Sequence, residues 1–268
     1  MADITRIAKA GSDWNESDLK AYNIRVEFQD ATTFFETPRL PDPILTTEEV
    51  LEVSGADQTT TDDGYALLRL LEAAMDTTEN EESAVHDFAA ELFRACGYTG
   101  RGRLARTRKD ILFLTCGEYT YAKADACILN DNDEVILLVH EHKSHFDPEI
   151  ADPAAQPAQL IAGAIAAFAE IRYKLERTCH SPSRQFKIMP GIILRETSPT
   201  FYKIPISEDL VTAVERGQYP TQETVVLAHT PAVPPSDSWD EPELDGMDPL
   251  DNRRVILSCF EAFKQFVN

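Results

Sequence analysis

The chain has 268 residues, of which 43 % are hydrophobic, and its 46 acidic and 25 basic side chains give a net charge of −21. These values are typical of a globular protein and exclude collagen, coiled coils and wholesale disorder. No apolar run approaches the ~18 residues that span a bilayer, and the N-terminus lacks the pattern of a signal peptide. We therefore expect an intracellular protein, cytoplasmic or nuclear, with no membrane contact. Five widely spaced cysteines predict reduced thiols rather than disulfides.

Residues 1–60 combine three prolines with short apolar patches and are predicted to form an arm that packs on the main body. Residues 61–268 are predicted to form a single α/β domain. The apolar spacing predicts amphipathic helices at 65–75 and 85–96, and the second of these carries Glu91 on the flank of its apolar stripe. A carboxylate in that position either faces solvent or contributes to a metal site.

A cluster of basic residues follows the second helix and stands out in this acidic chain. Its members are Arg101, Arg103, Arg106, Arg108 and Lys109. Binding to nucleic acid draws its affinity from neutralising phosphates with Lys and Arg, so the net charge disfavours general adhesion to DNA. We predict that the cluster forms a loop that contacts substrate phosphates.

The sequence period then changes to that of strands, and runs at 111–116, 122–129 and 134–143 predict a β-meander. The third run is apolar on both faces, which is typical of a central strand covered by helices on both sides. Further elements are predicted in the order helix 157–177, strands 187–195 and 200–206, helix 207–216, strand 224–228, an acidic loop over 230–251, and helix 252–267, which Asp251 is expected to cap. The fold class is thus α/β, with a central mixed sheet flanked by helices and a C-terminal helix.

Charged residues occur where the predicted meander should be apolar. Glu141 and Lys143 are two apart at the end of the central strand, so their side chains share a face. A three- or five-residue connection after Asn130 places Asp125 opposite Val139, with Glu141 as its diagonal neighbour. A connection of two or four residues would turn Asp125 to the other face. Two carboxylates with a third nearby suit Mg²⁺ or Mn²⁺, and an adjacent ammonium suits metal-assisted hydrolysis of a phosphodiester.

This arrangement resembles the PD-(D/E)XK nuclease superfamily, and the similarity covers about residues 78–230. The resemblance implies a restriction-endonuclease-like core in which Asp125 and Glu141 bind the metal, Lys143 is catalytic, and Glu91 is a further metal ligand. Ala124 stands where the family has Pro, and Gln159 is followed by Gly163 rather than by Tyr. The implied activity is hydrolysis of DNA or RNA, with Gln159 and His142 as possible accessory residues. The segments 106–110 and 249–252 also resemble a group of uncharacterised fungal proteins.

Three alternatives stay open at this point. Asp125, Glu141 and Lys143 can instead form an ion pair at a sheet edge. His140 and His142 share the opposite face of the strand and, with His145 or a cysteine, offer ligands for a transition metal. Finally, the chain can have the PD-(D/E)XK fold but no catalytic activity. It would then act as a protein-interaction module that binds a protein partner or forms a homodimer.

Overall fold

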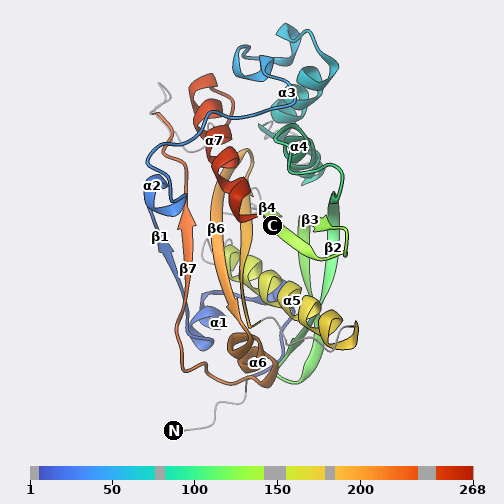
Figure 1. The fold of residues 1–268 in the computed structure, drawn as a ribbon, viewed down its shortest axis with the longest axis vertical. Coiled ribbons are helices and arrows are strands. Elements are labelled where there is room, and N and C mark those ends of the chain that lie inside the picture. The colour runs from blue at the N-terminus through green and yellow to red at the C-terminus, as the bar shows by residue number, and fades with distance from the viewer. Residues whose placement is uncertain (1–5, 76–81, 142–154, 179–184, 235–245, 268) are drawn as a thin grey trace.

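The computed structural model describes residues 6–75, 82–141, 155–178, 185–234 and 246–267 (Figure 1). In this part of the chain the centre of the molecule is a seven-stranded sheet in the order β1-β7-β6-β5-β4-β3-β2. Its strands are β1 (Ile24–Phe28), β2 (Arg103–Thr115), β3 (Glu118–Asn130), β4 (Val135–Glu141), β5 (Phe186–Arg195), β6 (Ser198–Ser207) and β7 (Thr224–His229). The pairs β1–β7 and β4–β5 are parallel and the remaining pairs are antiparallel, so the sheet is mixed.

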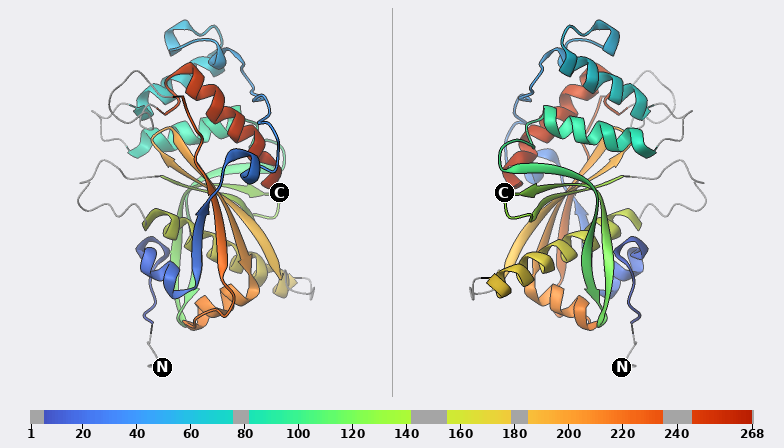
Figure 2. Two further views of the ribbon diagram at one scale, coloured as in Figure 1. Left: turned by 90° about the vertical axis from the view of Figure 1, so that its left-hand side faces the viewer. Right: turned by 90° about the vertical axis from the view of Figure 1, so that its right-hand side faces the viewer.

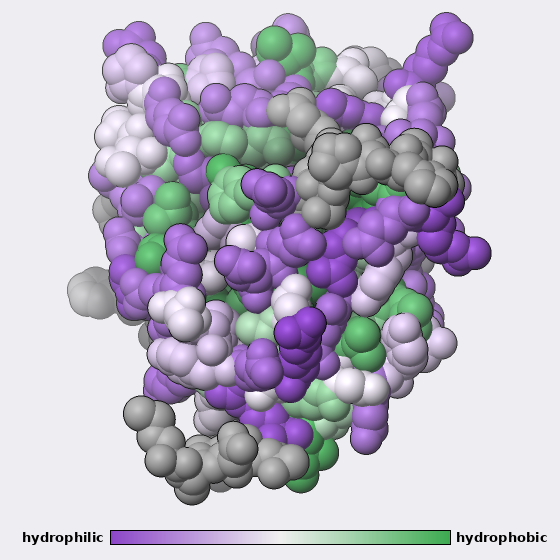
Figure 3. Space-filling view, turned by 60° about the horizontal axis from the view of Figure 1, so that its bottom comes forward, coloured by the Kyte–Doolittle hydropathy of each residue, from purple (hydrophilic) through white to green (hydrophobic). Residues whose placement is uncertain are grey.

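Helices cover both faces of this sheet (Figure 2). The helices α1 (Glu16–Ala21), α5 (Ala155–Thr178) and α6 (Glu208–Arg216) share one hydrophobic core with one face. The helices α3 (Asp62–Met75), α4 (Glu82–Ala95) and α7 (Leu250–Phe263), together with the short α2 (Ala31–Phe34), share a second core with the other face. Figure 3 views the end of the molecule that carries α6, where hydrophobic residues appear only in small groups among hydrophilic ones. The predicted α/β class, with a mixed sheet flanked by helices, is confirmed.

Most predicted elements are present because local apolar periodicity determined them. The helices expected at 65–75, 85–96, 157–177, 207–216 and 252–267 correspond to α3, α4, α5, α6 and α7. The β4 strand lies between β3 and β5, and its residues Val135–Val139 are all buried, as expected for a central strand. The four described cysteines are free thiols. Asp251 does not cap α7, because the N-cap position belongs to Pro249 and Asp251 lies in the first turn.

Two predicted segments differ from the structure. The basic cluster is not a loop: β2 begins at Arg103 and pairs with β3 from Arg103↔Asn130 to Thr115↔Glu118, so only Arg101 precedes the strand. A run of Arg and Lys gives no apolar alternation, which is why the strand was not expected there. Residues 1–60, predicted as an arm packed on the body, supply β1, which pairs with β7 as an edge strand of the sheet itself.

His229 is the last residue of β7, and it is buried where β7 meets α2. Its Nδ1 lies 2.9 Å from the Gln29 carbonyl, and its ring packs against Phe34 and Phe35. Among the described residues, its buried Nε2 has no hydrogen-bond partner. Burial lowers the pKa of His229 below its usual 6.5, because the charged imidazolium is poorly solvated there.

We expect this histidine to make the stability of the protein depend on pH. Its folded pKa is below its unfolded pKa, so its contribution is complete above pH 6.5 and is lost as the pH falls from 6.5 through the folded pKa. Urea unfolding at pH 7.5 and pH 5.5 should therefore show a larger loss of stability at low pH for the wild type than for His229→Asn, whose side-chain amide can replace the Nδ1 donor. Equal losses for the two proteins would contradict this assignment.

Candidate active site

Strands β3 and β4 separate in the middle of the sheet. They are paired from Leu129↔Val135 to Ala126↔Val139, and before Ala126 the β3 strand pairs with β2 alone. The distal half of the β2–β3 hairpin therefore bends away from the rest of the sheet, as its long green strands show in Figure 2. Asp125 is the first residue of β3 beyond the pairing with β4, so it lies at the fork between the two strands.

Both strands of the hairpin change direction at this position. In β3, Ala124 packs in the core beneath α5, whereas Ala126 packs in the core beneath α4, so the alternation of the strand breaks at Asp125. In β2, Arg108 adopts a left-handed conformation with a φ of 51° and is skipped in the register between Thr107↔Ala126 and Lys109↔Ala124. A left-handed arginine is strained, and this strain lies directly across from the candidate ligand.

Two histidines flank the Asp125 carboxylate. Its Oδ2 lies 3.4 Å from Nδ1 of His140 on β4, and its Oδ1 lies 3.9 Å from Nε2 of His86 on α4. The Asp125 side chain is 28 % exposed, whereas that of His140 is only 9 % exposed. Within the described part of the chain, Nε2 of His140 is buried without a hydrogen-bond partner. The carboxylate is thus reachable by solvent on one side and held by imidazoles on the other.

His86 was not anticipated from the sequence. It follows Val85, which belongs to the apolar stripe of α4. The sequence alone does not distinguish a histidine at this position that contacts a site from one that faces solvent. Only the packing of α4 against the fork brings its ring close to Asp125.

The predicted register of Asp125 is wrong by one residue. The turn has the expected three-residue connection, with Leu129 opposite Val135, but Ile128 then pairs with Leu137, so Ile136 is an extra residue in β4. Beyond this bulge Val139 pairs with Ala126, and Asp125 therefore lies level with His140 rather than with Val139, so the register does not supply the face shared with Glu141 that the sequence predicted. A bulge depends on packing on both faces of a strand and leaves no mark in the apolar pattern.

The positions of Glu141 and Lys143 are described only in part. Glu141 is the last residue of β4 and its backbone pairs with Leu194 of β5. The Glu141 side chain and residues 142–154, which include His142, Lys143 and His145, lie outside the described residues. The convergence of Asp125, Glu141 and Lys143 on one site thus stays a prediction.

Glu91 already has a partner on its own helix. Its carboxylate accepts hydrogen bonds from Nε and Nη2 of Arg94, at 3.0 and 2.5 Å, and Arg94 also lies 3.0 Å from Asp63. These bonds raise the pKa of the Arg94 guanidinium, which stays charged and neutralises Glu91. His86, rather than Glu91, is the α4 residue that the structure places beside Asp125.

Some of the residues predicted to contact phosphates, and the accessory glutamine, already have partners within the protein, whereas others are exposed. Arg103 donates to the Val267 carbonyl at 3.0 Å, and Nζ of Lys109 lies 3.6 Å from Glu170 of α5. Gln159 donates to the Ser12 carbonyl at 2.8 Å and so fastens the N-terminal segment to α5. Exposed side chains remain at three positions of the cluster: Arg101, Arg106 and Arg108.

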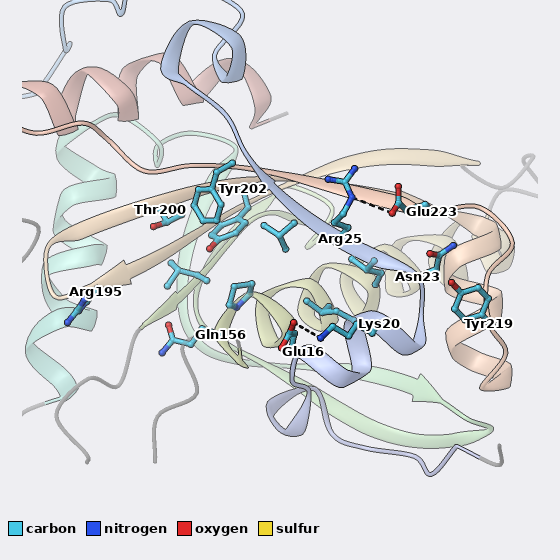
Figure 4. Close-up of a pocket in the computed structure, with 16 residues that line it drawn as sticks. Glu16, Lys20, Asn23, Arg25, Gln156, Arg195, Thr200, Tyr202, Tyr219 and Glu223 are labelled. Carbon is cyan, nitrogen blue, oxygen red and sulfur yellow. Dashed lines mark hydrogen bonds and ion pairs between the residues drawn. The ribbon is translucent and has the colours of Figure 1, made fainter. Parts of the chain in front are cut away.

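A cavity of about 860 Å³ lies on the α5 side of the sheet, between β1, β5, β6 and α1 (Figure 4). Its wall includes Ile193, which is the parallel partner of His140, so the cavity begins one strand from the fork. Two of the cations that line it are already paired: Lys20 lies 2.7 Å from Glu16, and Arg25 lies 3.3 Å from Glu223. Arg195 also lines the cavity, and among the described residues its buried Nε has no hydrogen-bond partner.

The described residues contain no group of three or more His, Cys, Asp or Glu side chains arranged to hold a metal ion. They also include no helix with the length and hydrophobicity that crossing a membrane requires. No protein-family model matches the chain, and no curated protein is significantly similar to it. The candidate site therefore rests on its own geometry.

Proposed function

We propose that this protein is a divalent-metal-dependent nuclease with a restriction-endonuclease-like core. The observation that carries the proposal is the position of Asp125 at the fork between β3 and β4, on the strand next to the one that ends at Glu141. The order of elements supports it: helix α4, the antiparallel β2–β3–β4 meander, helix α5, and then β5 parallel to β4. This is the order in which the superfamily carries its Asp and its Glu-x-Lys.

The residues at the fork suit a hard cation. Asp125 offers a half-buried carboxylate whose orientation is held by His86 and His140, and oxygen ligands of this kind are those that Mg²⁺ and Mn²⁺ prefer. Asp125 and Glu141 would hold the cation, which would supply Lewis-acid chemistry at the phosphodiester. Lys143 orients the attacking water and stabilises the negative charge that develops on the phosphorus oxygens. The P–O bond to the leaving oxygen breaks as the bond from the attacking water forms, and the leaving oxygen takes its proton from solvent.

The fork also has a source of positive charge. Arg108 is exposed and lies across the hairpin from Asp125, and Arg106 is exposed on the same strand. In a chain of net charge −21, these side chains are suited to bind the phosphates on either side of the scissile bond.

A cleavage assay tests the proposal. The wild type should cleave at least one of four substrates, single- or double-stranded DNA or RNA, in Mg²⁺ or Mn²⁺, and EDTA should abolish the cleavage. Lys143→Ala should lower the rate by about a hundredfold or more, which is typical for loss of a group that stabilises transition-state charge. Lys20→Ala, in an exposed ion pair on α1, is the control and should cleave normally.

Absence of metal-dependent cleavage from all four substrates would contradict the proposal. Equal activity of Lys143→Ala and the control would contradict the role of Lys143. The net charge of −21 would then favour the catalytically inactive protein-interaction module, because an acidic surface repels nucleic acid.

A further inference from the structure

The distal half of the β2–β3 hairpin has one buried face and one exposed face. Ile111, Phe113, Ala122 and Ala124 point into the core beneath α5. The opposite face is formed by Leu112, Tyr119, Tyr121 and Lys123, and we call it the tyrosine face. Tyr119 is 66 % exposed and Tyr121 is 56 % exposed, so two aromatic rings lie in solvent on adjacent positions of one face.

The tyrosine face leads to the candidate active site. Tyr119, Tyr121 and Lys123 alternate along β3 on the same side, and two residues beyond Lys123 the row reaches Asp125, where the alternation of the strand breaks. A strand rises 3.2–3.4 Å per residue, so neighbouring members of this row are about 6.7 Å apart. The row therefore ends at the carboxylate in the fork, about two such steps from Tyr121.

The charge of this hairpin is opposite to that of the whole chain. Residues 103–125 contain five basic and three acidic side chains, in a protein whose net charge is −21. Asp110 lies opposite Lys123 in the register, and Arg106 and Arg108 are exposed on the same hairpin without being part of the buried face. A polyanion is thus attracted to this hairpin more than to the rest of the surface.

Exposed aromatic rings beside basic side chains are the combination that binds single strands of nucleic acid, because bases stack on the rings and phosphates meet the cations. A duplex hides the faces of its bases, so it cannot stack on these rings. A second copy of the chain is less suited to this face, because the two hairpins that would meet carry net charge of the same sign.

We propose that the tyrosine face binds single-stranded nucleic acid and guides it to Asp125. The inference rests on the proposed function, since it makes the fork the place of cleavage. Tyr119 and Tyr121 supply stacking platforms, and Lys123 and Arg108 contact the phosphates between them. The substrate class is therefore a single-stranded or locally unpaired nucleic acid rather than an intact duplex.

Binding without cleavage tests this inference. The affinities of the full-length protein for a fluorescent 20-nucleotide single-stranded DNA, its RNA equivalent and the matching duplex are measured by anisotropy at low salt with EDTA. The variant Tyr119→Ala/Tyr121→Ala should bind both single strands at least about tenfold more weakly, as expected for the loss of stacked bases. Tyr119→Phe/Tyr121→Phe keeps the rings and should retain most of the affinity.

The matched control is Tyr65→Ala/Tyr219→Ala, which removes two tyrosines of similar exposure from α3 and from the segment before β7. It should bind like the wild type. Lys123→Gln should reduce the slope of log affinity against log salt by about one unit. Thermal unfolding of each variant shows whether the hairpin is still folded, because a change on an exposed face should leave Tm nearly unchanged.

The outcomes separate this inference from the proposed function. If the protein cleaves nucleic acid but the Tyr119/Tyr121 alanine variant binds normally, the tyrosine face is not the binding surface and the nuclease proposal stands. If the wild type binds single strands through these tyrosines but cleaves nothing, the nuclease proposal fails and the binding surface stands. Preference for the duplex, or a dimer that the alanine variant converts to a monomer without a change in affinity, would overturn the inference.

Discussion

Replacing Asp125 with Asn is expected to lower the rate of metal-dependent cleavage by about a thousandfold, equivalent to ~4 kcal/mol of transition-state stabilisation. The substitution keeps the shape of the side chain but removes the negative charge that attracts the cation. His86 and His140 remain beside the amide, so the fork keeps its packing. Catalysis should fall while the stability of the protein changes little.

The measurement pairs single-turnover cleavage with Mn²⁺ binding followed by electron paramagnetic resonance. Asp125→Asn should lose both the cleavage and the tight binding of Mn²⁺. Asp110→Asn, an exposed aspartate of the same hairpin, is the control and should lose neither. If Asp125→Asn binds Mn²⁺ as tightly as the wild type, Asp125 is not a metal ligand and its contacts with the two histidines are structural.

Replacing Arg253 with Met is expected to lower the free energy of unfolding by about 3–5 kcal/mol, the range for loss of one partner from a buried charged network. Arg253 lies on α7 and is 1 % exposed. Its guanidinium donates hydrogen bonds to five backbone carbonyls, namely those of Val50, Val53, Ser54, Met247 and Asp248. Burial lowers the pKa of this guanidinium, since these carbonyls replace only part of its hydration.

The loss arises because methionine fills the space but leaves these carbonyls without a donor. The segment at 50–54 would then detach from α7, although it is about 200 residues away in the sequence. Urea unfolding of Arg253→Met should be compared with Arg254→Met, an exposed neighbour that donates to the Leu51 carbonyl. Similar small losses for the two variants would show that the carbonyls are satisfied by water instead.

The helices and the central strand were predictable because their signals are local. The apolar stripe of α4 repeats at three and four residues, and β4 is apolar on both faces, so each segment carries its own pattern. The basic half of β2 carries no such pattern. Its strand exists because β3 supplies pairing partners on both sides of Arg108, and those partners are not visible in residues 103–109 themselves.

The parallel pairing of β1 with β7 joins residues about 200 positions apart, so local periodicity could not place it. The role of Arg253 was hidden for the same reason, because three of the five carbonyls that bind it belong to residues 50–54, about 200 positions away. A buried arginine at position 253 looks in the sequence like any charged residue of a helix.

At the candidate site the sequence alone identified Asp125 by its chemistry, as an acidic residue in an apolar meander. Its register, its neighbours and its position at the fork were decided by tertiary structure. The bulge at Ile136 moved it level with His140, the bend at Arg108 brought it between two helical layers, and α4 placed His86 beside it. The sequence specifies the residue types directly, but bulges and bends depend on the packing of distant segments and cannot be predicted from a local pattern.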